Sequence, residues 1–404
     1  MYKLQNYVQR YAWGSPTALT ERFGFANPDR LPMAEVWMGA HPSASSKVVI
    51  RGNWQSLAAE IAAHPLSMLG QTTYQTFQQL PFLVKLLAAD RPLSIQVHPT
   101  RYAAQQGFRR ENEAQIPPDA PTRNYRDANH NPEVIYALTP FKALKGFKPF
   151  DEIARAFQRL NWDHRAVEVF IDNPTSDSLQ QLFTTCLRLA EDDKQRVLTH
   201  LLHSVAQQEQ PIGQTVRMMA EVWPTDLGLL MPLFLNIIDL QPGEALYLAA
   251  GTPHTYLQGV GMEVMANSDN VLRAGLTTKH IDIEELVANV QFQEDKAEQR
   301  LLAPTISVNQ YHYQVPETDF SLSIITITSP CSILTQGLPQ LILCLEGVLN
   351  LSSAQQALTL SLGESLFIPA DQEAYTIKGE GQIALTTVGS CQAPITITPI
   401  DGSC

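Results

Sequence analysis

Two histidines and a carboxylate stand where strands of the chain are expected to begin or end. His98 closes a short alternating segment, and Ser94 and Gln96 share its side because strand residues two apart point to the same face. His254 follows a Gly-Thr-Pro turn and is expected on a loop at the mouth of a barrel, and Glu133 opens an apolar run. Two His and one Glu are the ligand set of a catalytic zinc that keeps an open position, and the Gln96 amide oxygen can complete the shell.

The middle of the chain is predicted to be helical. No glycine occurs between Gly146 and Gly213, and Leu179, Leu182 and Phe183 recur at helical spacing. Asn-Pro and Gln-Pro pairs within this stretch mark breaks between helices. We therefore expect a helical insertion over residues 150–228.

The flanking regions have the pattern of β-strands. Short apolar or alternating runs are bounded by glycine and proline turns, as in sandwiches and barrels, and they occupy 93–97, 133–138, 233–240, 245–248, 321–328, 341–345 and 358–362. A Gly-Glu-x-Leu-aromatic pattern occurs in both flanks, which suggests two related barrels. The predicted fold is mainly β, with two cupin-like β-barrels (jelly rolls) and an α-helical domain. The predicted domains are a metal-binding one (1–149 and 229–303), the insertion (150–228) and a C-terminal β domain (304–404).

Composition narrows the class of protein. With 404 residues, 44% of them hydrophobic and 17% charged, the chain is expected to be a soluble globular protein. A formal charge of −12 makes nucleic acid an unlikely partner, and no segment has the pattern of a signal peptide or a membrane span. The five cysteines are widely spaced and odd in number, which favours buried thiols in a reducing cytoplasm.

Four sequence blocks together resemble the signature of type I mannose-6-phosphate isomerases, which are metal-dependent enzymes of cupin fold. The blocks are Gln96-Val-His98-Pro, Tyr125-Arg-Asp-Ala-Asn-His-Asn-Pro-Glu133, Gly251-Thr-Pro-His254 and Glu263-Val-Met-Ala-Asn-Ser-Asp-Asn-Val-Leu-Arg273-Ala-Gly-Leu. Tyr11-Ala-Trp-Gly14 and Ala34-Glu-Val-Trp37 also fit, so the resemblance covers nearly the whole chain.

This resemblance implies one zinc ion per chain and names its ligands. By motif, the ligands are Gln96, His98, Glu133 and His254, and the catalytic arginine of the family falls on Arg273. One position departs from the family pattern, because Asn131 stands where the family has lysine. An asparagine keeps hydrogen bonding but loses the charge, and Lys85 or Lys279 is the expected substitute cation.

The implied reaction interconverts mannose 6-phosphate and fructose 6-phosphate through an enediol. It needs a proton-transfer group, for which Glu263, Asp269 and Lys85 are candidates, and a cation such as Arg273 to stabilise the enediolate. Because the chain has no nucleotide-binding glycine motif, Ser94 and Lys279 are the candidate phosphate contacts, and Tyr256 and His130 are further expected substrate contacts. The expected partner is thus a small sugar phosphate, and the chain is expected to be a monomer.

Two other functions use the same residues. Two histidines and a carboxylate are also the ligand set of iron(II) oxygenases, and a glutamine ligand argues only mildly against that chemistry. A non-catalytic sugar-binding or storage cupin is the second alternative. Such a protein needs no arginine to stabilise an enediolate, so the role of Arg273 discriminates between binding and catalysis.

Overall fold

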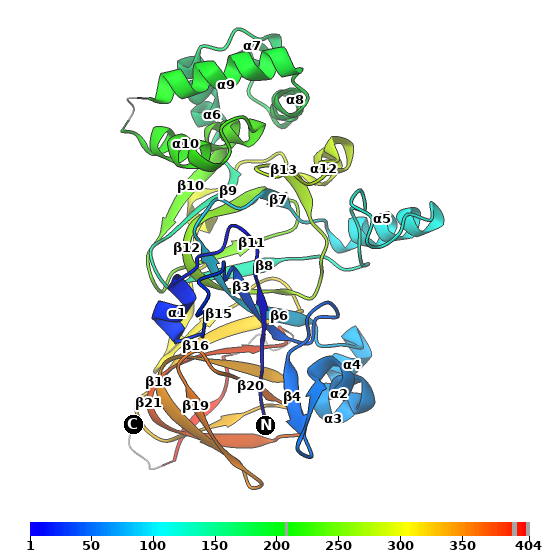
Figure 1. The fold of residues 1–404 in the computed structure, drawn as a ribbon, viewed down its shortest axis with the longest axis vertical. Coiled ribbons are helices and arrows are strands. Elements are labelled where there is room, and N and C mark those ends of the chain that lie inside the picture. Colours follow the sequence, from blue (N-terminus) through cyan, green and yellow to red (C-terminus); the bar gives the residue numbers. More distant parts are fainter. Residues whose placement is uncertain (207–208, 390–393, 401–404) are drawn as a thin grey trace. The chain divides into compact units, whose positions relative to one another are not determined.

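The computed structural model describes residues 1–206, 209–389 and 394–400. The chain forms two compact units (Figure 1). The first unit consists of Met1–Ala88, Met262–Asn267 and Leu302–Cys404, and the second of Ala89–Gly261 and Ser268–Leu301. The polypeptide passes between the units repeatedly, so neither is a continuous stretch of sequence.

The larger part of the first unit is a ten-stranded antiparallel sheet. Its strands are β1 (Tyr2–Lys3), β14 (Thr305–Ser307), β15 (Gln310–Tyr313), β16 (Ser321–Ile327), β17 (Cys331–Leu334), β18 (Gln340–Ser352), β19 (Ala357–Ser361), β20 (Ser365–Ile368), β21 (Ala374–Thr387) and β22 (Ile397–Pro399). The order is β1-β20-β18-β21-β16-β15-β14, with β17 beside β21, β19 beside β18 and β22 beside β17. Because Tyr2 lies opposite Phe367, the start of the chain is tied into this C-terminal sheet.

The first unit also holds a smaller group of strands and four short helices. They are β2 (Tyr7–Gln9), β3 (Glu35–Gly39), β4 (Lys47–Ile50), β5 (Asn53–Ser56), β6 (Phe82–Ala89), α1 (Ala18–Phe23), α2 (Leu57–Ala63), α3 (Pro65–Leu69) and α4 (Gln71–Phe77). Strands β2, β3 and β6 pair antiparallel in that order, and β4 and β5 form a hairpin. The register of β3 and β6 places Trp37 opposite Lys85.

The strands of the second unit carry most of the predicted site. They are β7 (Ile95–Val97), β8 (Glu133–Ala137), β9 (Phe141–Phe147), β10 (Leu235–Leu240), β11 (Ala245–Leu248), β12 (His254–Ala266), whose end enters the first unit, and β13 (Leu272–Gly275). Strand β7 lies between β13 and β12, β9 lies between β12 and β10, and β8 pairs with β11. Neighbouring antiparallel strands therefore bring residues from four distant parts of the chain side by side.

The second unit also contains helices, and those between Phe150 and Val222 lie in the stretch that the sequence predicted to be helical. The helices of this unit are α5 (Arg101–Glu113), α6 (Phe150–Leu160), α7 (Arg165–Asp172), α8 (Ser176–Leu187), α9 (Glu191–Val205), α10 (Pro211–Val222), η1 (Leu227–Leu230), α11 (Met231–Phe234), α12 (Ile283–Asn289) and η2 (Ala297–Gln299). Figure 1 shows α6–α10 gathered into one group. Helix α8 buries Leu179, Leu182 and Phe183 on one face, and a capping box between Thr175 and Ser178 closes its first turn.

The predicted fold class, mainly β with a helical insertion, is confirmed, but some local predictions were wrong. His254 is the first residue of β12 and not part of a loop, because Gln96 and Lys145 pair with it from the strands on either side. The strand expected over 93–97 is only Ile95–Val97. Leu233 belongs to helix α11, since Pro232 occupies a first-turn position where its missing N–H costs nothing.

The prediction that the cysteines are buried thiols is confirmed for the three cysteines that the structure describes. Cys186, Cys331 and Cys344 are free and buried, whereas Cys391 and Cys404 lie outside the described residues. Burial raises the pKa of the Cys344 thiol to about 11, which keeps it protonated and unreactive. Among the helices that the structure describes, none has the length and apolar character needed to cross a membrane.

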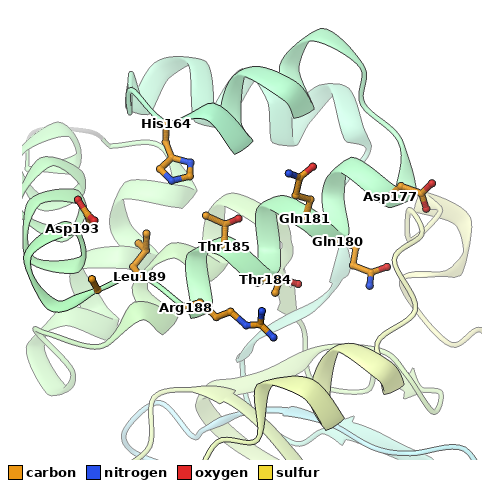
Figure 2. A pocket seen from close by; sticks show the side chains of 10 residues that line it. His164, Asp177, Gln180, Gln181, Thr184, Thr185, Arg188, Leu189 and Asp193 are labelled. Atoms are coloured by element: carbon orange, nitrogen blue, oxygen red, sulfur yellow. The ribbon is translucent and has the colours of Figure 1, made fainter.

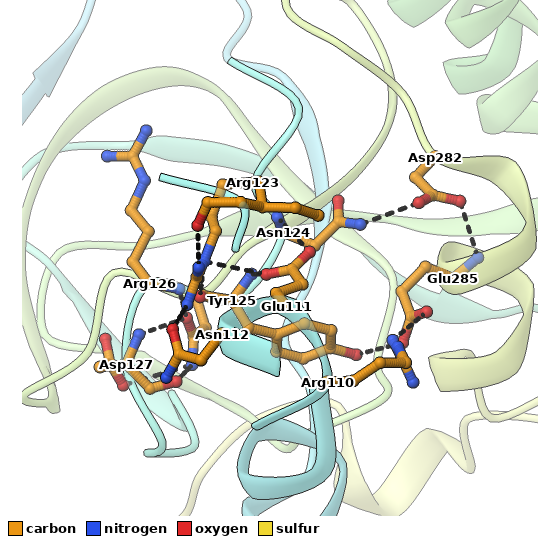
Figure 3. A network of polar contacts seen from close by, with 12 residues as sticks. Arg110, Glu111, Asn112, Arg123, Asn124, Tyr125, Arg126, Asp127, Asp282 and Glu285 are labelled. Atoms are coloured by element: carbon orange, nitrogen blue, oxygen red, sulfur yellow. Dashed lines mark hydrogen bonds and ion pairs between the residues drawn. The ribbon is translucent and has the colours of Figure 1, made fainter. Parts of the chain in front are cut away.

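Helix α5 anchors the segment that leads to β8 (Figure 3). The Glu111 carboxylate accepts hydrogen bonds from the main-chain N–H groups of Asn124 at 3.0 Å and Tyr125 at 2.8 Å, and it pairs with Arg123 at 3.1 Å. The fully buried Tyr125 ring packs against Gly107 of the same helix face. A Cβ atom at Gly107 would lie 2.2 Å from this ring, so only glycine fits there.

We predict that Gly107→Ala destabilises the protein by about 1–3 kcal/mol, because the added methyl group overpacks the Tyr125 contact. At an exposed helix position the same substitution would stabilise by about 1 kcal/mol, so the sign is diagnostic. Gln105→Ala, at an exposed position of α5, is the matched control and should leave the thermal midpoint nearly unchanged. Thermal denaturation of the three proteins checks this, and a Gly107→Ala protein as stable as the parent contradicts it.

Candidate metal centre

Three of the four predicted metal ligands form one buried cluster. The donor atoms of His98, Glu133 and His254 all lie within 4.8 Å of one another. Nε2 of His98 lies 3.1 Å from Oε1 of Glu133, and Nε2 of His254 lies 3.6 Å from Oε2 of the same carboxylate. The two imidazole nitrogens and the carboxylate therefore face a common point.

Strand register also brings Gln96 and Arg273 to this place. Gln96 of β7 lies opposite His254 of β12 on one side and opposite Arg273 of β13 on the other. Residues directly opposite one another on antiparallel strands project from the same face of a sheet. Gln96, His254 and Arg273 thus form a row across three strands, which agrees with a shared site.

Main-chain carbonyls fix the orientation of both histidine rings. Nδ1 of His98 lies 2.7 Å from the carbonyl oxygen of Asn270, and Nδ1 of His254 lies 2.9 Å from that of Thr252. A carbonyl only accepts hydrogen bonds, so each Nδ1 donates, and each Nε2 is left on the side of Glu133 as the ring nitrogen that can hold a metal. This donor set, two imidazole nitrogens and one carboxylate, fits zinc.

The carboxylate of the cluster stays ionised. Burial alone would raise the pKa of Glu133, but His98 and His254, through charge and hydrogen bonding, hold that pKa well below its usual range. The side-chain amide of Asn131 adds a neutral donor, because its Nδ2 donates to Oε1 of Glu133 at 3.2 Å. The negative charge of Glu133 is thus available to a bound cation.

Positive charge gathers at the edge of the same strands. Burial, and next the nearby charge of Arg126, lower the pKa of the Arg273 guanidinium. Among the residues that the structure describes, the guanidinium groups of Arg273 and Arg126 form no hydrogen bond and no ion pair with a carboxylate. Arg126 did not enter the sequence-based site, although it lies in a quoted block. Two neighbouring guanidiniums of this kind favour an anionic ligand.

The other predicted site residues of the second unit differ in their burial and in their hydrogen-bond partners. Tyr256 of β12 is buried edge-on against Phe141, with ring centroids 5.4 Å apart. Nε2 of the buried His130 accepts a hydrogen bond from Arg101 at 2.5 Å. The main-chain N–H of Asp269 donates to Asp127 at 2.9 Å. Ser94, just before β7, is half-buried, and Lys279 is exposed.

Two of the predicted catalytic residues belong to the first unit. Nζ of Lys85 pairs with Oε2 of Glu263 at 2.9 Å, and both side chains are buried. The Lys85 ammonium also lies 5.2 Å from the ring centroid of Trp37, whose indole N–H donates to Glu35 at 2.7 Å. The pair forms a buried acid–base couple of the kind that proton transfer requires.

A cavity of about 610 Å³ lies elsewhere, on the helical insertion (Figure 2). Most of the residues that line it are of polar type, and they come from α8, the start of α9 and neighbouring loops, including His164, Gln181, Thr185, Arg188 and Asp193. None of the predicted site residues lines it. This cavity is therefore separate from the buried cluster of His98, Glu133 and His254.

Comparisons with known proteins show to which family this chain belongs. Models of the phosphomannose isomerase type I catalytic domain, its helical insertion domain and the mannose-6-phosphate isomerase cupin domain match residues 1–150, 156–235 and 309–388. The mannose-6-phosphate isomerase of Escherichia coli K12 is 46% identical over 385 residues, which cover 95% of this chain and 98% of that protein. The chain belongs to the type I phosphomannose isomerase family. The human mannose-6-phosphate isomerase is 31% identical over 407 residues, covering 92% and 94%.

Solved structures of the type I phosphomannose isomerase family show the same fold. A zinc-bound crystal structure of mannose 6-phosphate isomerase superposes with a TM-score of 0.92 at 46% identity, covering 96% of this chain and 99% of that one. A variant of the phosphomannose isomerase from Salmonella typhimurium gives 0.94 at 45% identity, covering 96% and 99%. The resemblance inferred from sequence blocks is thereby confirmed at the level of family and fold.

We predict that the purified protein binds one zinc ion per chain and that His98→Ala and His254→Ala each lose it, because each removes a donor from the cluster. His200→Ala, on an exposed position of α9, should keep full zinc content. Metal analysis of the four proteins checks this. A chelator should abolish activity while circular dichroism stays close to that of the parent, and activity that survives complete metal removal contradicts the assignment.

Proposed function

We propose that this chain is a zinc-dependent aldose–ketose isomerase that interconverts mannose 6-phosphate and fructose 6-phosphate through an enediol. The observation that carries this proposal is the buried cluster of His98, Glu133 and His254 beside Arg273, in a chain of the type I phosphomannose isomerase family. An iron(II) oxygenase and a non-catalytic cupin are not favoured, because the relatives are isomerases and a solved relative holds zinc.

Each group of residues has a part in this reaction. Gln96, His98, Glu133 and His254 are proposed to hold the ion, which when bound would act as a Lewis acid toward the substrate oxygens. Arg273 would stabilise the negative charge that develops on the enediolate oxygen, because its guanidinium stays charged and has no other acceptor among the described residues.

Proton transfer between the two reacting carbons needs a base. Glu263 and Lys85 are candidates because their buried ion pair holds a carboxylate and an ammonium 2.9 Å apart, so that one can take a proton as the other gives one. Asp269, on the loop that leads to Arg273, is the third candidate. Substitution of each of the three residues in turn tests which one transfers the proton.

The phosphate requires cationic and hydroxyl contacts. Ser94 and Lys279 are proposed to bind it, and Arg126 adds charge near Arg273. Tyr256 and His130 are proposed further substrate contacts. We also propose the domain division 1–149 with 229–303, 150–228 and 304–404, and a cytoplasmic monomer. The three buried free thiols support the reducing compartment.

We predict that Arg273→Ala lowers kcat by about 100–1,000-fold, as expected for loss of an oxyanion-stabilising group. Zinc content and the thermal midpoint should change little, because Arg273 is only half-buried and its guanidinium makes no hydrogen bond or ion pair with the residues that the structure describes. Arg273→Lys should recover only part of the rate, since lysine keeps the charge but lacks the planar fork. Steady-state kinetics with mannose 6-phosphate measures this, and turnover at the parent rate in Arg273→Ala would remove Arg273 from the mechanism.

We predict that Lys279→Met weakens the use of phosphorylated sugar more than the use of neutral mannose. Methionine keeps much of the aliphatic stem and removes only the charge, so a phosphate contact would appear as a raised KM for mannose 6-phosphate. Lys296→Met, another exposed lysine of the second unit, is the control. Equal losses for both sugars in Lys279→Met would count against a phosphate contact.

A further inference from the structure

Asp127 is the centre of a hydrogen-bond network that joins two loops of the second unit (Figure 3 shows its position). Oδ1 accepts from the N–H of Asn129 at 2.8 Å and from the Ser268 hydroxyl at 2.9 Å, and Oδ2 accepts from the N–H of Asp269 at 2.9 Å. The Asn270 amide donates to Oδ1 as well, at 3.2 Å. The carboxylate therefore clamps the 268–270 loop to the 127–129 segment.

Asn270 completes the clamp from the other side. Its side chain is fully buried, and Nδ2 donates to the carbonyl oxygens of Asp127 and Asn129, both at 2.8 Å. Its Oδ1 accepts from the N–H of Arg126 at 2.7 Å. Both amide hydrogens and the amide oxygen have partners, so the side chain has one well-defined orientation.

This orientation matters because the main chain of Asn270 contacts a predicted metal ligand. The carbonyl oxygen of Asn270 accepts the Nδ1 hydrogen of His98 at 2.7 Å. His254 differs, since its Nδ1 donates to Thr252, two residues earlier in the same turn. The Nδ1 contact of His254 is thus local, whereas that of His98 is made to a loop that is 172 residues away in sequence.

We propose that Asp127 and Asn270 are positioning residues of the metal centre. They hold the Asn270 carbonyl where it fixes the tautomer and ring direction of His98, so that Nε2 points toward Glu133. This inference rests on the proposed zinc function. Loosening the clamp would leave His98 able to turn and would reduce the affinity of the site for zinc, although neither residue touches the ion.

The test measures zinc affinity by competition with a chromophoric chelator in the full-length protein. Asp127→Asn keeps the shape of the side chain but replaces one accepting oxygen with a donor that faces other donors. We expect zinc affinity to fall by about 10–100-fold, the usual effect of losing such an outer partner. Ser268→Ala removes the hydroxyl that donates to Asp127 and accepts from the N–H of Asn270 at 3.2 Å, but leaves the Asp127 carboxylate in place, and should give a smaller loss in the same direction.

Asp282→Asn is the matched control. Asp282 lies in the same region (Figure 3) and also accepts two hydrogen bonds, from Asn124 at 2.8 Å and from the N–H of Glu285 at 3.0 Å, but it contacts no predicted ligand. Asp282→Asn should keep the zinc affinity of the parent and change the thermal midpoint little, because an asparagine oxygen still accepts from the N–H of Glu285 and caps a helix about as well as aspartate.

The outcomes separate the inference from the proposed function. Parent-like zinc affinity in Asp127→Asn, or equal losses in Asp127→Asn and Asp282→Asn, would overturn the positioning role. If Asp127→Asn does not fold, Ser268→Ala decides: a reduced affinity supports the role and an unchanged affinity overturns it. A parent protein that binds no zinc would instead overturn the proposed function.

Discussion

The burial of the Glu133 carboxylate is the constraint that the surrounding strands and loops satisfy. An ionised carboxylate taken out of water loses several kcal/mol of solvation unless opposite charge or hydrogen-bond donors replace that water. Both histidines turn Nε2 toward Glu133, and their Nδ1 atoms are engaged by main-chain carbonyls. A divalent cation bound between the two Nε2 atoms and the carboxylate would supply the positive charge that balances Glu133. The electrostatic cost of burying Glu133 thus explains why β7, β8 and β12 converge at this point.

Local patterns in the sequence predicted the elements well, since they depend on short-range periodicity. The helical face of α8 with Leu179 and Phe183, and the strand β11, lie where spacing placed them. Pairing between strands is a long-range property and was not readable. His254 therefore looked like a loop residue, although the two strands that pair with it make it the start of β12.

The site was predictable only in part for the same reason. The proposed ligands were found because they match sequence blocks. Arg126, Asp127 and Asn270 lie in the same blocks, but no sequence pattern distinguishes them from the neighbouring polar residues. The net charge of −12 also gave no information about the site, because it is a sum over all residues of the chain. Near Arg273 lies a second guanidinium, that of Arg126, whose charge helps to lower the pKa of Arg273, and this proximity exists only in the folded chain.

The two histidines proposed as metal ligands are held in place in different ways. His254 opens a strand and is fixed by the turn before it, so its geometry follows from a few consecutive residues. His98 follows a strand of three residues and depends on the clamp around Asn270, which forms only when distant segments have packed. A complete donor set thus requires the tertiary fold of the second unit, and metal binding and folding of this unit are thermodynamically linked.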